Sequence, residues 1–256
     1  MEDWSATQYL KFEDDRTRPP RDLVAQVPLQ RPRLIVDLGC GPGNSTELLV
    51  ERFPQSEIVG LDSSPDMLKK ARQRLPQCSF IEADIATWQP DPRTDLIFGN
   101  AVMQWLPDHP AIMRRLLEGM PKGGVLAIQM PAMHDTPLRR APYDIAASGP
   151  WAECLRGVTS APGILSAAEY WDVLRPHVAS LDMWQTTYIH ALAGEDAVLE
   201  WASGSSLRPF LDRLTDEQKV AFGQAYAEAV RPHYPRRADG ATLLPFQRLF
   251  MVARKG

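Results

Sequence analysis

A glycine-rich turn between a short apolar run and a helical pattern constrains this chain most. Residues 36–44 read Val-Asp-Leu-Gly-Cys-Gly-Pro-Gly-Asn, and they follow the apolar run 34–36. Because glycine has no Cβ, the backbone at Gly39 and Gly41 can turn sharply and approach a ligand closely. A strand, a glycine turn and a helix in this order predict an α/β sheet that binds a nucleotide-like ligand at the carboxyl end of the strand.

An acid directly before the glycines narrows the choice of ligand. Asp37 ends the first apolar run, whereas a dinucleotide places its pyrophosphate on the helix N-terminus and disfavours negative charge there. S-adenosylmethionine carries an ammonium and a sulfonium group and no phosphate. Asn44 and Ser45 can cap the following helix. We therefore expect S-adenosylmethionine to contact Asp37, Gly39, Gly41 and Asn44.

Further polar residues follow the next apolar runs, 58–61, 78–81 and 96–98. An acid after the second strand is placed to accept hydrogen bonds from ribose hydroxyls, and it would do so for NAD as well as for S-adenosylmethionine. Beyond it, a Ser-Ser-Pro start predicts a helix. The residues expected at the cofactor on these grounds are Asp62, Ser63, Met67, Asp84, Ile85, Asn100 and Trp105.

These motifs, in this order, resemble the class I S-adenosylmethionine-dependent methyltransferases over about the first half of the chain. The resemblance implies an α/β, Rossmann-like fold with a mostly parallel seven-stranded sheet, an antiparallel last strand and helices on both faces. The fifth strand is expected at 125–130, the sixth at 182–192 and the last at 246–253. Helical insertions between these last strands would form a lid over the cofactor.

Composition excludes several classes of protein. The chain has 256 residues, a net charge of -4 and three cysteines without metal-ligand spacing. Apolar runs are too short for a membrane span, and the N-terminus does not resemble a signal peptide. Mild acidity disfavours a nucleic-acid partner, and so does Asn-Ala-Val-Met-Gln-Trp at 100–105, which lacks the Pro-Pro-aromatic run of base methyltransferases. We expect a cytoplasmic enzyme without a metal; the sequence leaves its oligomeric state open.

One methyltransferase domain, 1–256, is expected to have four parts. These are an N-terminal helical cap (1–30), a cofactor-binding core (31–131) and two helical lid insertions (132–180 and 193–240). In the cap, Tyr9 and Phe12 share a helix face, and Arg16 lies one turn further on. Tyr9 and Arg16 are expected to reach the cofactor, Arg16 at its carboxylate. The alternative is an ordinary surface helix anchored by Phe12.

Arginines in and around the insertions suggest an anionic substrate, because a guanidinium binds a carboxylate with two parallel hydrogen bonds. Arg208 follows the Gly204-Ser205-Ser206 turn and is the preferred candidate, although most single arginines are solvated or paired at the surface. His134 and His190 lie at strand ends on the ligand side and are weaker candidates. His109 precedes a proline and is expected to be a cap or a surface group.

Several segments beyond the common fold resemble one family. They include the N-terminal stretch 4–24, Ala-Ile-Gln-Met-Pro at 127–131, Trp-Gln-Thr-Thr-Tyr-Ile-His at 184–190, the insertion 200–211 and the C-terminal stretch 243–254. Together they resemble the bacterial trans-aconitate 2-methyltransferases over nearly the whole chain. That resemblance implies methyl transfer to a carboxylate of trans-aconitate, a small polycarboxylate, and release of a monomethyl ester. From spacing and composition alone we infer only a small-molecule methyltransferase.

Esterification of a carboxylate requires little acid–base chemistry, because the carboxylate is already ionised at neutral pH. We therefore expect no catalytic acid or base and a reaction run by positioning. The residues expected at the substrate are Tyr9, Trp105, His134, Tyr188 and Arg208; the aromatic ones could equally be ordinary core. Methylation of another small carboxylate or of a hydroxyl metabolite, and a regulator that binds the cofactor without transfer, remain as alternatives.

Overall fold

The computed structural model describes the backbone of residues 13–158 and 163–256, and side chains from residue 17 onward within those ranges. The elements, in chain order, are α2 (Glu13–Ala25), β1 (Leu34–Leu38), α3 (Asn44–Arg52), β2 (Glu57–Asp62), α4 (Pro65–Arg74), β3 (Ser79–Glu82), β4 (Thr94–Asn100), η1 (Met103–Trp105), α5 (His109–Gly119), β5 (Val125–Pro131), α6 (Pro137–Ala146), α7 (Ala167–Leu174), η2 (Arg175–His177), β6 (Val178–Leu192), α8 (Ala197–Ser203), α9 (Arg208–Leu211), α10 (Asp216–Val230) and β7 (Thr242–Lys255).

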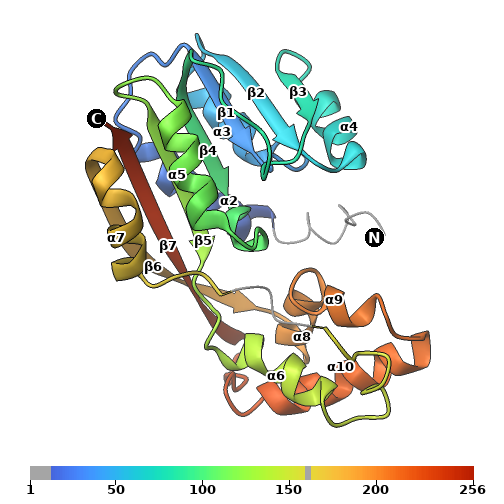
Figure 1. The fold of residues 1–256 in the computed structure, drawn as a ribbon. Coiled ribbons are helices and arrows are strands. Elements are labelled where there is room, and N and C mark those ends of the chain that lie inside the picture. Colours follow the sequence, from blue (N-terminus) through green and yellow to red (C-terminus); the bar gives the residue numbers. More distant parts are fainter. Residues whose placement is uncertain (1–12, 159–162) are drawn as a thin grey trace.

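The seven strands form one sheet in the order β3-β2-β1-β4-β5-β7-β6 (Figure 1). Strands β1 to β5 pair in parallel, whereas β7 is antiparallel to both β5 and β6. The predicted mostly parallel sheet with an antiparallel last strand is thus confirmed. Its parallel order places the carboxyl ends of β1, β2 and β4 side by side, where such sheets bind ligands.

Helices cover both faces of this sheet because its central strands are apolar on both sides. All five residues of β1 are buried. On one face, Val36 and Leu38 belong to a core with α5 and α7. On the other, Ile35 packs with Leu23 of α2 and Leu49 of α3. The C-terminal half of α2 is therefore part of the core.

The helix starts show which local predictions hold. At α4, Ser64 is the N-cap and its hydroxyl accepts a hydrogen bond from the Met67 amide. At α10, Thr215 and Gln218 form the predicted capping box. The expectation that Asn44 and Ser45 cap α3 is wrong. Gly43 is the N-cap, at φ +94°, and the Ser45 hydroxyl donates to Asp37 instead.

A second unit of helices lies beyond the end of the sheet (Figure 1). Helices α6, α8, α9 and α10 share a core of their own, built around Trp201, Phe210, Phe222 and Tyr226. The predicted insertion 132–180 does not behave as one lid segment. Its helix α7 packs through Tyr170 into the sheet core, and its last residues already belong to β6. We call α6 with α8–α10 the helical unit.

The helical unit is carried by an extension of the two last strands. Residues 248–254 of β7 pair with β5 on one side. Residues 242–247 continue past the end of β5 and, among strands, pair with residues 187–192 of β6 alone. Both strands are therefore longer than predicted, because the apolar pattern covers only part of each.

No helix within the described ranges is long and apolar enough to cross a membrane.

Candidate functional site

The glycine turn lies between β1 and α3 and has the backbone conformation that its glycines predict. Gly39, Gly41 and Gly43 have φ values of +60°, +54° and +94°. A Cβ on Gly39 would lie 2.3 Å from Val102 Cγ2, so the turn packs tightly on the segment after β4. A Cβ on Gly41 would meet no atom within 4 Å. The turn is therefore tight on the side of β4 and open at Gly41, where a ligand can approach the backbone.

Asp62 holds this turn against the end of β2. Its Oδ2 accepts a hydrogen bond from the Gly41 amide and its Oδ1 from the Ser64 amide, both at 2.9 Å. A carboxylate offers about four lone-pair positions, so two remain for a ligand. Of the neighbours predicted at the cofactor, Ser63 is exposed and Met67 is buried in α4. The structure thus brings Asp62 and Gly41, both expected at the cofactor, into direct contact.

Asp37 is fully buried beneath the turn. Its Oδ2 accepts hydrogen bonds from the hydroxyls of Ser45 (2.8 Å) and Thr46 (2.7 Å). Its Oδ1 has no hydrogen-bond partner among the described residues. Burial raises the pKa of this carboxyl to about 7, against the opposing effect of the two hydroxyls. A cationic group bound above the turn would favour the ionised form.

Asp84 and Ile85 follow β3, beside Asp62. The Asp84 side chain is exposed, and its Oδ1 accepts from the Ala86 amide at 2.8 Å. Ile85 is buried in the sheet core. The Arg115 guanidinium donates to the carbonyls of Ile85, Ala86 and Trp88 and fixes this segment. Ile85 thus shapes the edge of the site from within the core, and Asp84 lies on its surface.

The segment after β4 links the glycine turn to the helical unit. Asn100 accepts a hydrogen bond from the side chain of Gln129, which in turn accepts from the buried Arg248 at 3.1 Å. The next residue, Ala101, has φ +54°, a strained conformation for a residue with a Cβ. This turn leads into η1, where the Trp105 side chain is 41% exposed.

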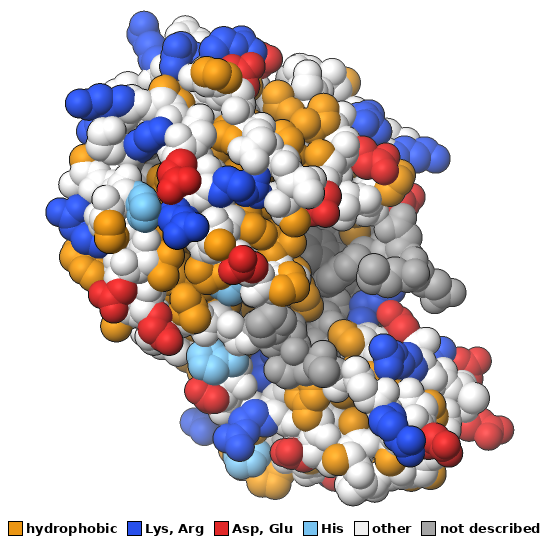
Figure 2. Space-filling model, in the orientation of Figure 1, with side chains coloured by type: hydrophobic (Ala, Val, Ile, Leu, Met, Phe, Trp, Pro, Cys, Tyr) orange, Lys and Arg blue, Asp and Glu red, His pale blue; other side chains and the backbone are white. Residues whose placement is uncertain are grey.

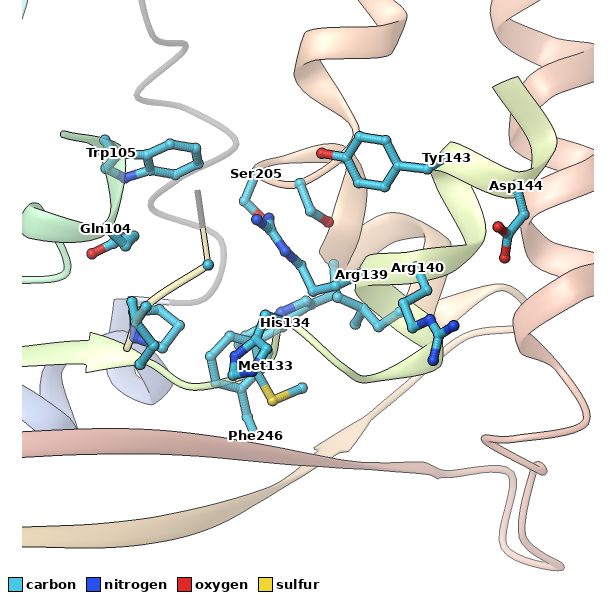
Figure 3. Close-up of a pocket in the computed structure, with 16 residues that line it drawn as sticks. Gln104, Trp105, Met133, His134, Arg139, Arg140, Tyr143, Asp144, Ser205 and Phe246 are labelled. Carbon is cyan, nitrogen blue, oxygen red and sulfur yellow. The ribbon is translucent and has the colours of Figure 1, made fainter. Parts of the chain in front are cut away.

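A cavity of about 300 Å³ lies between η1 and the helical unit (Figure 3). In the space-filling view, the molecule is hollowed between the part that contains the sheet and the helical unit (Figure 2). The walls of the cavity come from η1, the segment after β5, α6, the end of α8 and β7. The described lining residues are Gln104, Trp105, Pro131, Met133, His134, Leu138, Arg139, Arg140, Tyr143, Asp144, Gly163, Ile164, Trp201, Ser205, Ser206 and Phe246.

Two of the predicted substrate residues, Trp105 and His134, line this cavity. Trp105 stands on the wall nearest the sheet. His134 is exposed and lies 3.0 Å from the Asp135 carboxylate. Tyr9 and the side chain of Arg16 lie outside the described residues, so their expected roles stay predictions.

Tyr188 is placed elsewhere. Its side chain is 3% exposed, and its hydroxyl donates to Asp22 of α2 at 2.7 Å. The Arg18 guanidinium lies over its ring, 5.3 Å from the centroid. The expectation that Tyr188 binds substrate is therefore corrected. The alternation of β6 turns this side chain toward α2, and Tyr188 fixes that helix to the sheet.

Arg208 also lies outside the cavity lining. It begins the short helix α9, and its Nε is 3.8 Å from Asp212 Oδ2, one turn further on. Helical spacing explains this pairing, because residues four apart share a face. The structure therefore does not bring the preferred arginine to the site.

The histidines differ from expectation in the same way. His109 is not a surface group: it is 2% exposed, and its ring contacts the Leu106 carbonyl (3.0 Å) and the Tyr170 hydroxyl (2.5 Å). It thereby joins α5 to α7. His190 is buried behind the cavity wall, where its ring stacks on Trp201 with centroids 4.7 Å apart.

Sequence reasoning missed the polar residues that α6 contributes, above all Arg139 and Tyr143. Both follow Leu138, whose side chain is buried in the helical unit. The signal in the sequence was their spacing, since residues i and i+4 of a helix share a face. What the sequence did not show was that this face borders a cavity. Within the described ranges, no group of three or more His, Cys, Asp or Glu side chains is arranged to hold a metal ion.

Comparisons with known proteins agree with this architecture. A family model described as a methyltransferase domain matches residues 35–124. Among solved structures, YcgJ of Bacillus subtilis superposes with a TM-score of 0.61 at 12% identity, covering 93% of this chain and 98% of its own. A protein of Bacillus halodurans described as a putative methyltransferase superposes with a TM-score of 0.60 at 15% identity. This match covers 93% of this chain and 99% of the other. At these identities the likeness concerns the fold.

Full-length relatives are much closer in sequence. The trans-aconitate 2-methyltransferase of Rhodopseudomonas palustris strain BisB5 is 49% identical, and the match covers 100% of both chains. The enzyme of that name from an Azoarcus species is 50% identical over 99% of each chain. These matches cover the glycine turn and the helical unit alike. The chain belongs to the trans-aconitate 2-methyltransferase family and has the class I methyltransferase fold that its strand-end motifs predict.

Proposed function

We propose that this chain transfers the methyl group of S-adenosylmethionine to one carboxylate of trans-aconitate and releases a monomethyl ester. The observation that carries the proposal is the cavity between η1 and α6. It adjoins the strand ends that carry the glycine turn, and it contains a guanidinium and several hydroxyl groups. The name of its relatives suggests trans-aconitate as the substrate, and the guanidinium and hydroxyl groups of the cavity could bind its carboxylates.

The residues at the strand ends fit the cofactor. The open space at Gly41 would admit its methionine part, and Asp62 retains acceptor positions for the ribose hydroxyls. Asp84 and Ile85 would border the adenine. Gly39, Asn44, Ser63, Met67 and Asn100, with Tyr9 and Arg16, complete the set that we propose for the cofactor. When bound, S-adenosylmethionine supplies a methyl group activated by its sulfonium.

For the rest of the reaction, the protein has to position the substrate carboxylate and to exclude water. An ionised carboxylate attacks without a general base, so no side chain has to remove a proton. Trp105 stands where the cavity meets the strand ends and would align the attacking oxygen with the methyl group. We retain the division into cap, core and lid as a proposal, with α7 moved from the lid to the core.

Incubation with cofactor labelled in the methyl group tests this function. We expect label to appear in an ester when trans-aconitate is present, and mass spectrometry of the product to identify the esterified carboxylate. The acceptor panel contains trans-aconitate, cis-aconitate, citrate and uncharged alcohols. Transfer to alcohols alone would support a hydroxyl methyltransferase. Cofactor binding without transfer to any acceptor would support a regulator, and either outcome would overturn the proposal.

Two further points belong to this proposal. A small polycarboxylate, and not a nucleic acid, is the partner: basic and acidic side chains are interspersed over the face that Figure 2 shows. The setting is the reducing cytoplasm, which is consistent with free thiols at Cys40, Cys78 and Cys154. Burial raises the pKa of the Cys40 thiol, so that this residue of the glycine turn is not a nucleophile.

A further inference from the structure

We infer that Arg139 of α6, and not Arg208, binds a carboxylate of the substrate that does not react, and that it sets the preference for polycarboxylates. This inference rests on the proposed function and names the residue that gives the site its specificity.

The position of Arg139 is the first argument. Its side chain is half-buried, and in Figure 3 its guanidinium extends from α6 into the cavity, toward Ser205 and the wall that carries Trp105. The side chain of the next residue, Arg140, is exposed and extends the other way. Both arginines border the cavity, but only the half-buried side chain of Arg139 extends into it.

The lack of a protein counter-ion is the second argument. The Arg139 backbone amide donates to the Thr136 carbonyl, but its guanidinium makes no hydrogen bond or ion pair with any residue of the described ranges. Other arginines of the fold do: Arg74 pairs with Glu47 at 2.7 Å, and Arg33 with Asp95 at 2.8 Å. A partly desolvated charge is costly unless an opposite charge compensates it. An anion that enters the cavity would provide that compensation.

Hydroxyl groups around Arg139 strengthen the argument. Tyr143 lies one helical turn further on, its ring held edge-on against Phe210 with centroids 4.9 Å apart. Its hydroxyl has no hydrogen-bond partner among the described residues. The buried Ser206 hydroxyl, also on the cavity wall, has none either. A guanidinium with two free hydroxyls is a set of donors, and an ionised carboxylate only accepts.

The charge and the orientation of the cavity agree with an anionic ligand. Its described lining contains the guanidinium groups of Arg139 and Arg140, whereas the one carboxylate among the described lining residues, that of Asp144, is exposed. Arg139 lies on the wall of the helical unit, opposite Trp105. A substrate with several carboxylates can therefore place one at Arg139 and another at the strand ends, where the methyl group would be.

Steady-state kinetics of Arg139→Gln and Arg139→Lys test the inference. The matched control is Arg213→Gln, at an exposed arginine between α9 and α10 that does not line the cavity. Loss of a charged hydrogen-bonding partner predicts a KM for trans-aconitate that rises about tenfold to a hundredfold in Arg139→Gln. The KM of Arg139→Lys should lie between those of the parent and Arg139→Gln, because an ammonium keeps the charge but cannot make two parallel hydrogen bonds to a carboxylate. The affinity for S-adenosylmethionine, measured by calorimetry, should stay unchanged in all three variants.

Substrates that lack one carboxylate sharpen the test. Mesaconate, itaconate and cis-glutaconate are trans-aconitate without one or another of its three carboxylates. For the dicarboxylate that lacks the group bound by Arg139, the parent and Arg139→Gln should have the same affinity. For the other two, Arg139→Gln should bind more weakly. This non-additivity would show a direct contact, which a merely structural arginine would not produce.

Binding in the presence of S-adenosylhomocysteine separates the inference from the proposed function. If the parent binds trans-aconitate without esterifying it, the proposed function fails, and loss of that binding in Arg139→Gln still supports the inference. If Arg139→Gln binds and esterifies trans-aconitate as the parent does, the inference is overturned and the proposed function stands. Absence of trans-aconitate binding by the parent would overturn both. Tyr143→Phe, with its smaller change, should raise KM less than Arg139→Gln.

Discussion

The sheet core and the helical unit of this chain present their ligand-binding groups in different ways. In the core, candidate groups follow strand ends, and parallel pairing brings Gly41 and Asp62 into contact although 21 positions separate them. In the helical unit, candidate groups stand on helix faces, and tertiary packing decides which face borders the cavity. Arg139 and Arg140 are neighbours in sequence, yet only the first points into the cavity (Figure 3).

In the proposed site, backbone topology positions the groups for the cofactor, whereas side-chain packing positions the groups for the substrate. Substitutions in the core should therefore alter stability and cofactor affinity together. Those on the helical unit should alter substrate affinity with little effect on folding. Four predictions examine this contrast, from the largest expected effect to the smallest.

Asp37→Asn should change how stability depends on pH. The folded-state pKa is about 7 and the ordinary value is 3.8, so the folded apoprotein retains a proton that the unfolded chain releases between these values. Stability of the parent therefore falls across that window as pH rises, by an order of about 4 kcal/mol for the full shift. Asparagine removes this dependence. The free energy of unfolding, measured with urea, should favour the variant over the parent increasingly from pH 4 to pH 8. A difference that does not change with pH would mean that Asp37 is ionised in the folded protein throughout this range.

Gly39→Ala and Gly41→Ala form a matched pair within one turn. A Cβ at residue 39 would meet Val102 at 2.3 Å, whereas one at residue 41 meets nothing within 4 Å. Overpacking and a positive φ should together destabilise Gly39→Ala by about 3 kcal/mol. Gly41→Ala bears the backbone strain alone, about 1 kcal/mol, but should bind S-adenosylmethionine more weakly than its stability loss explains. Equal unfolding free energies for the two variants would contradict this account.

Asp62→Asn should weaken S-adenosylmethionine binding by about 1–3 kcal/mol, because it replaces an ionised acceptor at the ribose. Calorimetry measures the change, and Asp91→Asn, at an exposed carboxylate that pairs with Arg93, is the control. Asp62 also holds the Gly41 amide, so a smaller loss of stability should accompany the loss of affinity. Unchanged cofactor affinity in Asp62→Asn would remove this residue from the site.

Arg208→Ala should have the smallest effect. Its pairing with Asp212 is a partly exposed contact at 3.8 Å, which contributes about 0.5 kcal/mol. The KM for trans-aconitate should remain within a factor of about two of the parent, since pairs of this strength alter equilibria little. A KM that rises as much as in Arg139→Gln would restore Arg208 to the substrate and blur the contrast between the two arginines.

Much of the core was predictable because each step depends on neighbouring residues. Apolar runs located all seven strands, and Ser64 and Thr215 signalled the starts of their helices correctly. The helix start at Gly43 was missed, because a buried Asp37 takes the Ser45 hydroxyl that would otherwise cap α3. That contact joins residues of different elements, and local pattern cannot show it.

The predictions for several polar side chains failed for one physical reason. Helical periodicity identified α6 and α10 but not the partner of each face. Tyr188 and His109 are buried polar residues whose hydrogen-bond partners, Asp22 and Tyr170, lie 166 and 61 positions away. A sequence read by itself contains no signal for such distant pairs, and so it placed them at a ligand or at the surface.

The extension of β6 and β7 forms a two-stranded arm between the sheet and the helical unit. Residues 187–192 and 242–247 project past β5, a reach of about 20 Å for six residue pairs. A bend of about 5° at the base of such an arm displaces its tip by nearly 2 Å, and a misplacement of about 1 Å can cost a hundredfold in rate. If Arg139 binds the substrate as inferred above, the stiffness of this arm would set its distance from the methyl donor. Residues that touch neither ligand, but brace the arm where it leaves the sheet, would then affect the rate of the reaction.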